Sequence, residues 1–230
     1  MENNHPTDRR GFLGTLTAGA TTLGIATLFQ PLQASAGDIP GFDPEDPDAW
    51  FKPLKAKKHG IVFDVPGPHE IFPFAWPRVF LMTNEKTGTP AKDCGVVVVL
   101  RHSAIGYAME NRLWEKYKFG EVFKAEDPET KQPSVRNPFW QPKSGAFKVP
   151  GIGEVQIGIN ELQSSGVMFC VCSAAMTVYS AAVAQGGGMN ADDVYKDWAS
   201  GLLPGIQPVP SGVWAIGRAQ ENGCRYCFAG

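Results

Sequence analysis

Short apolar runs alternate along this chain with segments whose apolar residues recur at helical spacing. The run at 94–100 contains four consecutive valines with no polar alternation, which favours a strand buried on both faces, as in a parallel sheet. Similar runs predict four more strands, at 59–65, 167–171, 206–209 and 224–229. Because helical patterns separate these strands, the chain is predicted to be an α/β domain with a mostly parallel sheet.

Helical spacing predicts the intervening elements, at 69–85, 103–118, 155–165, 173–185, 191–200 and 212–221. Ser103, Asn190 and Ser211 each precede one of these helices, and short polar side chains are preferred N-caps. Two regions depart from the alternation. Residues 37–58 are rich in Pro, Asp and Lys and are expected to form an irregular arm, whereas 120–154 is expected to be a long insertion with a functional or interface role.

The N-terminal segment has the pattern of an export signal. Arg9 and Arg10 precede an uncharged, weakly apolar run at 12–29, and small residues follow at 34–36. Signal peptidases accept such a small-residue pattern, which places the predicted cleavage after Ala36.

The segment at 8–14 resembles the twin-arginine (Tat) consensus, although Asp8 and Gly14 replace its usual Ser or Thr and its Lys. We therefore expect the Tat translocase to export the protein to the periplasm and the mature chain to begin near Gly37. An ordinary secretory signal and an uncleaved anchor are the alternatives.

Charge and composition exclude some classes of partner. The formal net charge of −2 gives no reason to expect nucleic acid or an anionic membrane surface as a partner. No segment after the signal has the length and hydropathy of a membrane span. The chain lacks a Walker-type loop, and Gly186–Gly188 follows a helix rather than a strand, so no cofactor is predicted.

All five cysteines follow the predicted signal, at positions 94, 170, 172, 224 and 227. Their odd number leaves at least one thiol unpaired within a single chain. No His-rich or acidic cluster accompanies them, so no metal site is expected.

Cys172 is the leading candidate for chemistry, because it lies where the strand at 167–171 passes into a helix. Sites in open parallel sheets form beyond the carboxyl ends of the strands. A helix N-terminus also offers unpaired N–H groups and the positive end of the dipole, which favour the nucleophilic thiolate. The alternative is a small buried hydrophobic residue. Cys170, two residues earlier, is either a functional partner or part of the core.

Arg101 and His102 follow the strand at 94–100 and are expected at the same edge as Cys172 and the segment 208–212. Arg101 could bind an anionic sulfur species or another anion, and His102 could orient or protonate a substrate. Capping and surface roles are the alternatives for both.

Cys224 and Cys227 form a CxxC motif in a predicted strand. Positions three apart in a strand face opposite sides of the sheet, so a structural role is favoured over a redox pair. Cys94 opens a buried strand and is expected in the core.

Three segments, in order, resemble the DsrE/DsrF-like family of sulfur-handling proteins. They are GVVVVLRHSAIGYAMENRLWEKYK, ELQSSGVMFCVCSAA and LLPGIQPVPSGVWAIGRAQENGCRYCFA. The resemblance covers roughly 59–230, with 120–154 as an insertion. It implies a three-layer α/β/α flavodoxin-like domain with a mostly parallel five-stranded sheet, assembled as a homo-oligomer (trimer or hexamer). In sulfur-relay members a cysteine after the third strand carries a persulfide, and Cys172 occupies the matching place.

The resemblance favours an exported sulfur or thiol carrier of sulfurtransferase type, which uses Cys172 and a sulfur donor or acceptor protein. Two alternatives stay open. One is a non-catalytic oligomeric binding or assembly module of the periplasm. The other is thiol–disulfide exchange through Cys224 and Cys227.

Overall fold

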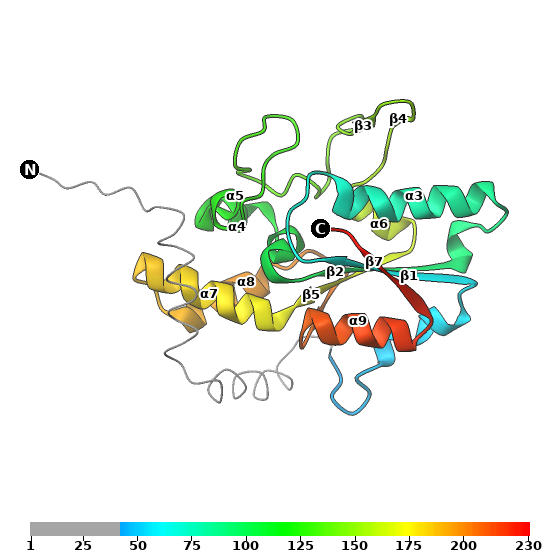
Figure 1. Ribbon diagram of the computed structural model, residues 1–230. Coiled ribbons are helices and arrows are strands. Elements are labelled where there is room, and N and C mark those ends of the chain that lie inside the picture. The colour runs from blue at the N-terminus through cyan, green and yellow to red at the C-terminus, as the bar shows by residue number, and fades with distance from the viewer. Residues whose placement is uncertain (1–41) are drawn as a thin grey trace, which may run out of the picture.

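The computed structural model describes residues 42–230, so Arg9, Arg10 and Ala36 of the predicted signal lie outside the described residues. A central five-stranded parallel sheet has the spatial order β6-β5-β2-β1-β7 (Figure 1). Its strands are β1 (His59–Val65), β2 (Cys94–Leu100), β5 (Val167–Cys172), β6 (Ile206–Val209) and β7 (Cys224–Phe228). The five predicted strands and the parallel α/β class are therefore confirmed.

Helices cover both faces of the sheet, which gives the three-layer α/β/α flavodoxin-like fold. Helices α3 (Phe72–Lys86) and α6 (Ile159–Ser164) lie on one face, and α9 (Gly212–Glu221) lies on the other with the 3₁₀ helix η1 (Ala49–Ala56). The valines of β2 alternate between these layers. Val96 and Val98 join the α3-side core, whereas Val97 and Val99 join the α9-side core. The unbroken apolar run is thus explained by burial on both faces.

The short 3₁₀ helix η2 (Ala91–Asp93) directly precedes β2. The remaining elements lie towards the carboxyl ends of the strands or in the insertion. They are η3 (His102–Ala108), α4 (Asn111–Tyr117), α5 (Phe119–Val122), β3 (Lys148–Val149), β4 (Gly153–Glu154), α7 (Ser173–Gly187) and α8 (Ala191–Ser200). Two predicted N-caps are confirmed. The Asn190 side chain accepts from the Asp193 N–H at 3.1 Å, and the Ser211 hydroxyl accepts from the Trp214 N–H at 3.3 Å.

The prediction of a single helix at 103–118 is wrong. The chain forms η3, is extended at Met109 and Glu110, and begins again as α4. The backbone here bonds to a distant segment instead of continuing a helix. Met109 forms a β-bridge with Leu202, and the Glu110 N–H donates to the Gly201 carbonyl. Ser103 is therefore not an N-cap, and its hydroxyl donates instead to the Pro66 carbonyl at 3.2 Å.

Two other segments differ from their predictions in extent. The arm predicted as irregular contains η1, because Phe51 and Leu54 are buried against the α9-side core. Helix α6 begins only at Ile159, since the Glu161 carboxylate accepts from the Gly158 N–H and fixes the helix start there.

Asn137 anchors the insertion to the rest of the domain. Its side chain is fully buried, and its amide nitrogen donates to the carbonyls of Tyr107 at 2.8 Å and Met109 at 3.0 Å. Its amide oxygen accepts from the Phe139 N–H at 3.1 Å. The insertion is thus tied to the segment that follows Arg101 and His102 in the chain.

Asp197 joins α8 to α4 and provides a pH-dependent contribution to stability. Burial alone would raise the pKa of Asp197, but hydrogen bonds from Lys116, Tyr117 and Arg112 outweigh it and lower that pKa well below its usual range. Removal of the carboxylate in Asp197→Asn is expected to lower the free energy of unfolding at pH 7 by about 1 kcal/mol, as for a partly exposed ion-pair network.

This difference should depend on pH in a defined direction. Because folding lowers the pKa, the contribution is complete above the unfolded pKa of about 3.9 and is lost as pH falls towards the folded value. Urea denaturation of wild type and Asp197→Asn from pH 7 to strong acid would measure it. A stability difference that widens in acid would contradict this assignment.

Candidate functional site

The carboxyl ends of the strands bring together residues that lie far apart in the sequence. Leu100 of β2 pairs with Val171 of β5, so Arg101 and Cys172 are the next residues on adjacent strands. Asp64 of β1 pairs with Val99 on one side and with Phe228 of β7 on the other. This edge therefore holds Cys172, Arg101 and Asp64 in successive strands.

Cys172 is both the last residue of β5 and the N-cap of α7. Its Sγ accepts a hydrogen bond from the Ala175 N–H at 3.3 Å, and the side chain is 7% exposed. The sulfur thus lies against the N-terminus of α7, where a negative charge is favoured by the backbone N–H groups and the helix dipole. This position makes Cys172 the candidate nucleophile of the site.

The Arg101 side chain is held by Asp64, which is itself hydrogen-bonded by Tyr226. Its Nε and Nη2 donate to the two carboxylate oxygens of Asp64, at 2.6 and 2.9 Å, and the Tyr226 hydroxyl donates to Asp64 Oδ2 at 2.8 Å. The hydrogen bond to Asp64 is the largest cause of a raised Arg101 pKa, and burial opposes it. Cys172 is the last of the groups whose charge would favour the cation, so Arg101 stays cationic and lies within electrostatic range of Cys172.

The N-termini of α7 and α9 meet at this edge. The Ala174 N–H of α7 donates to the Pro210 carbonyl at 3.2 Å, just before α9 begins. A Cβ at Gly212, the first residue of α9, would lie 2.5 Å from Arg101 Cβ, so only glycine leaves room for the arginine. The segment 208–212 thus bonds to α7 through the Pro210 carbonyl and leaves room for the Arg101 side chain at Gly212.

His102 contacts α7 through the Tyr179 hydroxyl. It has a left-handed backbone (φ 48°), and the Tyr179 hydroxyl lies 3.2 Å from its Nε2 and 3.3 Å from its Nδ1. A non-glycine residue with positive φ is uncommon and is often found at functional sites. The structure thus places His102, exposed, at the same edge of the sheet as Cys172.

The other cysteines are not brought to this site. Cys170 is fully buried in the α9-side core, whereas Cys172 packs with the α3-side core because the chain turns there into α7. Cys224 packs on the α9 side and Cys227 on the α3 side, and all five thiols are free. Burial raises the pKa of Cys94, Cys170 and Cys227, and raises that of Cys224 to about 11.

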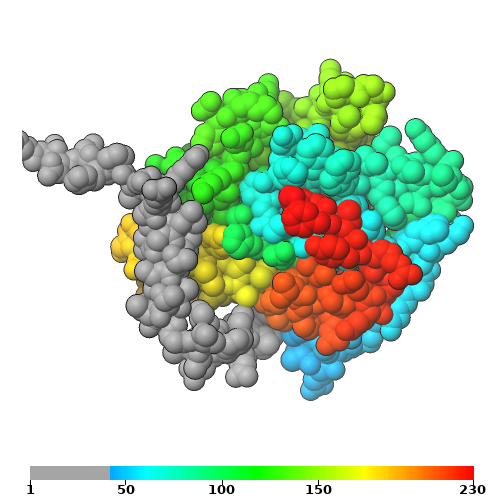
Figure 2. Space-filling model, in the orientation of Figure 1, coloured from blue at the N-terminus to red at the C-terminus, as the bar shows by residue number. Residues whose placement is uncertain are grey.

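Sequence reasoning missed Asp64 and Tyr226. Asp64 is the one acidic residue in the apolar strand HGIVFDV, and an acid in such a run is a signal that it has a buried partner. Tyr226 lies on the edge strand β7, shown in red at the surface in Figure 2, and is 49% exposed. Nothing in its sequence pattern links it to β1, from which it is separated by most of the chain.

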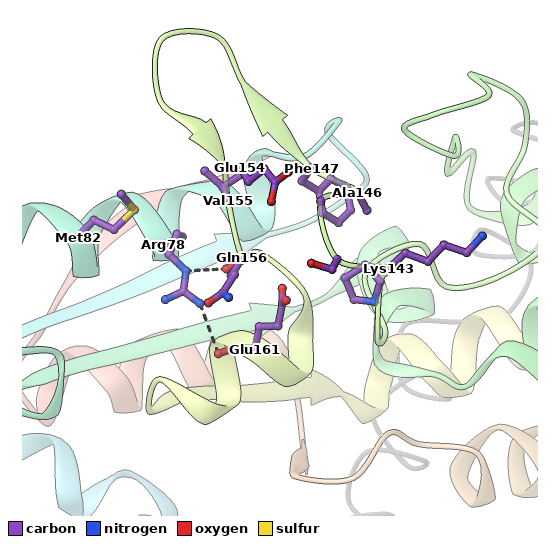
Figure 3. Close-up of a pocket in the computed structure, with 12 residues that line it drawn as sticks. Arg78, Met82, Lys143, Ala146, Phe147, Glu154, Val155, Gln156 and Glu161 are labelled. Carbon is purple, nitrogen blue, oxygen red and sulfur yellow. Dashed lines mark hydrogen bonds between the residues drawn. The ribbon is translucent and has the colours of Figure 1, made fainter.

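A separate pocket of about 310 Å³ lies between α3, α6 and the insertion (Figure 3). Arg78 borders it and donates to the Gln156 carbonyl at 2.6 Å, to the Ser165 hydroxyl at 3.0 Å and to the Glu161 carbonyl at 3.4 Å. Through these hydrogen bonds, Arg78 links α3 to α6 and to the segment before it. The pocket lining contains no cysteine or histidine, so it lacks a thiol or imidazole nucleophile.

Two further properties apply to residues 42–230. In that range no three His, Cys, Asp or Glu side chains are grouped so that they could hold a metal ion, and no helix has the length and apolar character needed to cross a membrane.

Comparison of the chain with protein-family models, with curated proteins and with solved structures found no match.

Proposed function

We propose that this chain is an exported, DsrE-like sulfur carrier that holds sulfane sulfur as a persulfide on Cys172. The observation that carries the proposal is the placement of the Cys172 sulfur as N-cap of α7, with the Ala175 N–H donating to it at 3.3 Å. The neighbouring Arg101 supplies a positive charge for an anionic donor. The resemblance of the segment around Cys172 to sulfur-relay proteins agrees with this chemistry.

Thiosulfate illustrates the step. The Cys172 thiolate attacks the outer sulfur of thiosulfate and forms a new S–S bond. The S–S bond of thiosulfate breaks, and sulfite leaves with its electron pair. The product is a persulfide anion, so the reaction needs no external oxidant or reductant. Helix α7 would stabilise the persulfide as it does the thiolate, because both carry a negative charge near its N-terminus.

The test is sulfur incorporation into the intact protein. Wild-type protein incubated with thiosulfate or polysulfide should gain one sulfur atom, found by intact-mass analysis and located at Cys172 by peptide mapping. A reductant should remove it. No gain in mass, or a gain located on another cysteine, would overturn the proposal.

Export and assembly complete the proposed function. The twin-arginine pattern at Arg9 and Arg10 supports passage through the Tat translocase to the periplasm. We also propose a homo-oligomer, trimeric or hexameric, and a protein that donates sulfur to Cys172 or accepts it. Size-exclusion chromatography with light scattering on the mature chain would test the assembly.

A non-catalytic assembly module is the second candidate function, and one observation favours it. Helix α3 exposes Trp76 (41%) and Val79 (40%) on its outer face, with Phe72 stacked on Trp76 at 5.0 Å. Exposed apolar groups of this kind suit a protein contact. A Cys172 that fails to react with iodoacetamide in the folded protein would favour this function over sulfur transfer.

A further inference from the structure

The buried Asp64 carboxylate accepts three side-chain hydrogen bonds. Its side chain is 4% exposed, and both carboxylate oxygens are occupied. Arg101 takes one bond to each oxygen, and Tyr226 adds a third from the edge strand β7. A planar guanidinium bound at two points has a fixed orientation. Within residues 42–230, these contacts leave Arg101 Nη1 with no protein acceptor.

The backbone around Arg101 restricts it further. Its N–H donates to the Val65 carbonyl at 3.0 Å, and its Cβ lies against the first turn of α9 at Gly212. The Arg101 side chain is 26% exposed. Its guanidinium can therefore reach a small anion while its aliphatic part stays fixed. The orientation of the free Nη1 edge thus depends on Asp64, and the placement of Asp64 is supported in turn by Tyr226.

We propose that Asp64 and Tyr226 are positioning residues that aim Arg101 at reagents approaching Cys172, so that this site selects anionic over neutral electrophiles. Where the reagent is a sulfur donor, this inference rests on the proposed function and assigns the donor class as small oxyanions such as thiosulfate. Neither residue touches the reacting sulfur. Both act through Arg101.

Alkylation of Cys172 tests the selectivity without any sulfur chemistry. Iodoacetate and iodoacetamide both lose iodide to a thiolate, but only iodoacetate carries a negative charge. The rate constants at Cys172 are measured by peptide mapping, so that reaction of half-buried Cys227 is counted separately. The ratio of the iodoacetate rate constant to the iodoacetamide rate constant measures the electrostatic attraction of the site for the anion. A change in the fraction of Cys172 that is thiolate affects both rate constants equally and cancels in this ratio.

Arg101→Gln should lower this ratio about five-fold, as expected for the loss of one nearby charge that solvent partly screens. Arg225→Gln is the matched control, because it removes the same charge from an exposed position in β7 and should leave the ratio unchanged. Tyr226→Phe keeps every charge but removes one hydrogen bond to the Asp64 carboxylate. Because Asp64 then orients Arg101 less firmly, the ratio should fall about two-fold.

Asp64→Asn distinguishes positioning from charge alone. The variant removes a negative charge near Cys172, so simple electrostatics predicts a higher ratio, whereas loss of the fixed guanidinium predicts a ratio close to that of Arg101→Gln. Tyr226→Phe, which is nearly isosteric, keeps the test open if Asp64→Asn fails to fold. A raised ratio in Asp64→Asn, or a wild-type ratio in Tyr226→Phe, would overturn the inference.

The outcomes also separate this inference from the proposed function. If wild type takes up no sulfur but the alkylation ratios follow the expected order, the carrier function fails and the positioning roles stand. If sulfur is taken up at Cys172 but the ratio in Asp64→Asn rises, the carrier function stands and the positioning roles fail.

Discussion

Cys172→Ser is expected to abolish sulfur incorporation while leaving the fold intact. Serine is a preferred N-cap, so its hydroxyl can accept the Ala175 N–H in place of the sulfur. The free energy of unfolding should therefore change by no more than about 1 kcal/mol. The hydroxyl cannot form a persulfide, so labelling by thiosulfate should fall to background in intact-mass analysis.

Cys227→Ser is the control for this result. Cys227 is the most exposed of the other cysteines, and it lies in β7 rather than at a helix N-terminus. Its replacement should leave labelling at the wild-type level. Equal labelling of Cys172→Ser and wild type would mean that sulfur binds elsewhere, and the carrier proposal would be wrong.

Asn137→Ala is expected to lower the free energy of unfolding more than Asp197→Asn or Cys172→Ser. It leaves the buried carbonyls of Tyr107 and Met109 without their donor, and the Phe139 N–H without its acceptor. At about 1 kcal/mol or more for each lost bond, the free energy of unfolding should fall by about 3–4 kcal/mol. The midpoint of urea denaturation measures this change.

Asn160→Ala provides the comparison. The Asn160 side chain accepts one hydrogen bond from the insertion, from the Gln141 N–H at 3.1 Å, in a more exposed position. It should cost only about 1 kcal/mol. Equal effects of the two variants would show that Asn137 is not the main anchor of the insertion.

The sheet could be predicted because its signal is local. The valine run of β2 and the N-caps at Asn190 and Ser211 fix strand and helix identity from neighbouring residues alone. The break after η3 could not be found in this way. Helical spacing continues through Met109 in the sequence, but long-range bonds to Gly201 and Leu202 compete for that backbone.

The candidate site was predicted only in part, for a similar reason. Cys172 and Arg101 follow the strands predicted at 167–171 and 94–100, so the rule for parallel sheets places both at one edge. Asp64 and Tyr226 are joined by a side-chain hydrogen bond between β1 and β7, and the sequence pattern of a strand does not show which other strand lies beside it. The opposite faces of Cys224 and Cys227 did follow from strand geometry.

The pairing of β1 with β7 also bears on when the site forms during folding. β1 and β7 come from opposite ends of the described chain, and the bond between Tyr226 and Asp64 spans 162 positions. Contacts of such long sequence separation are slow to form, because the loop between them must close first. Arg101 can meet Asp64 as soon as β1 and β2 pair, but Tyr226 can join them only after the last strand docks. The complete arrangement around Cys172 therefore reports that the whole domain has folded.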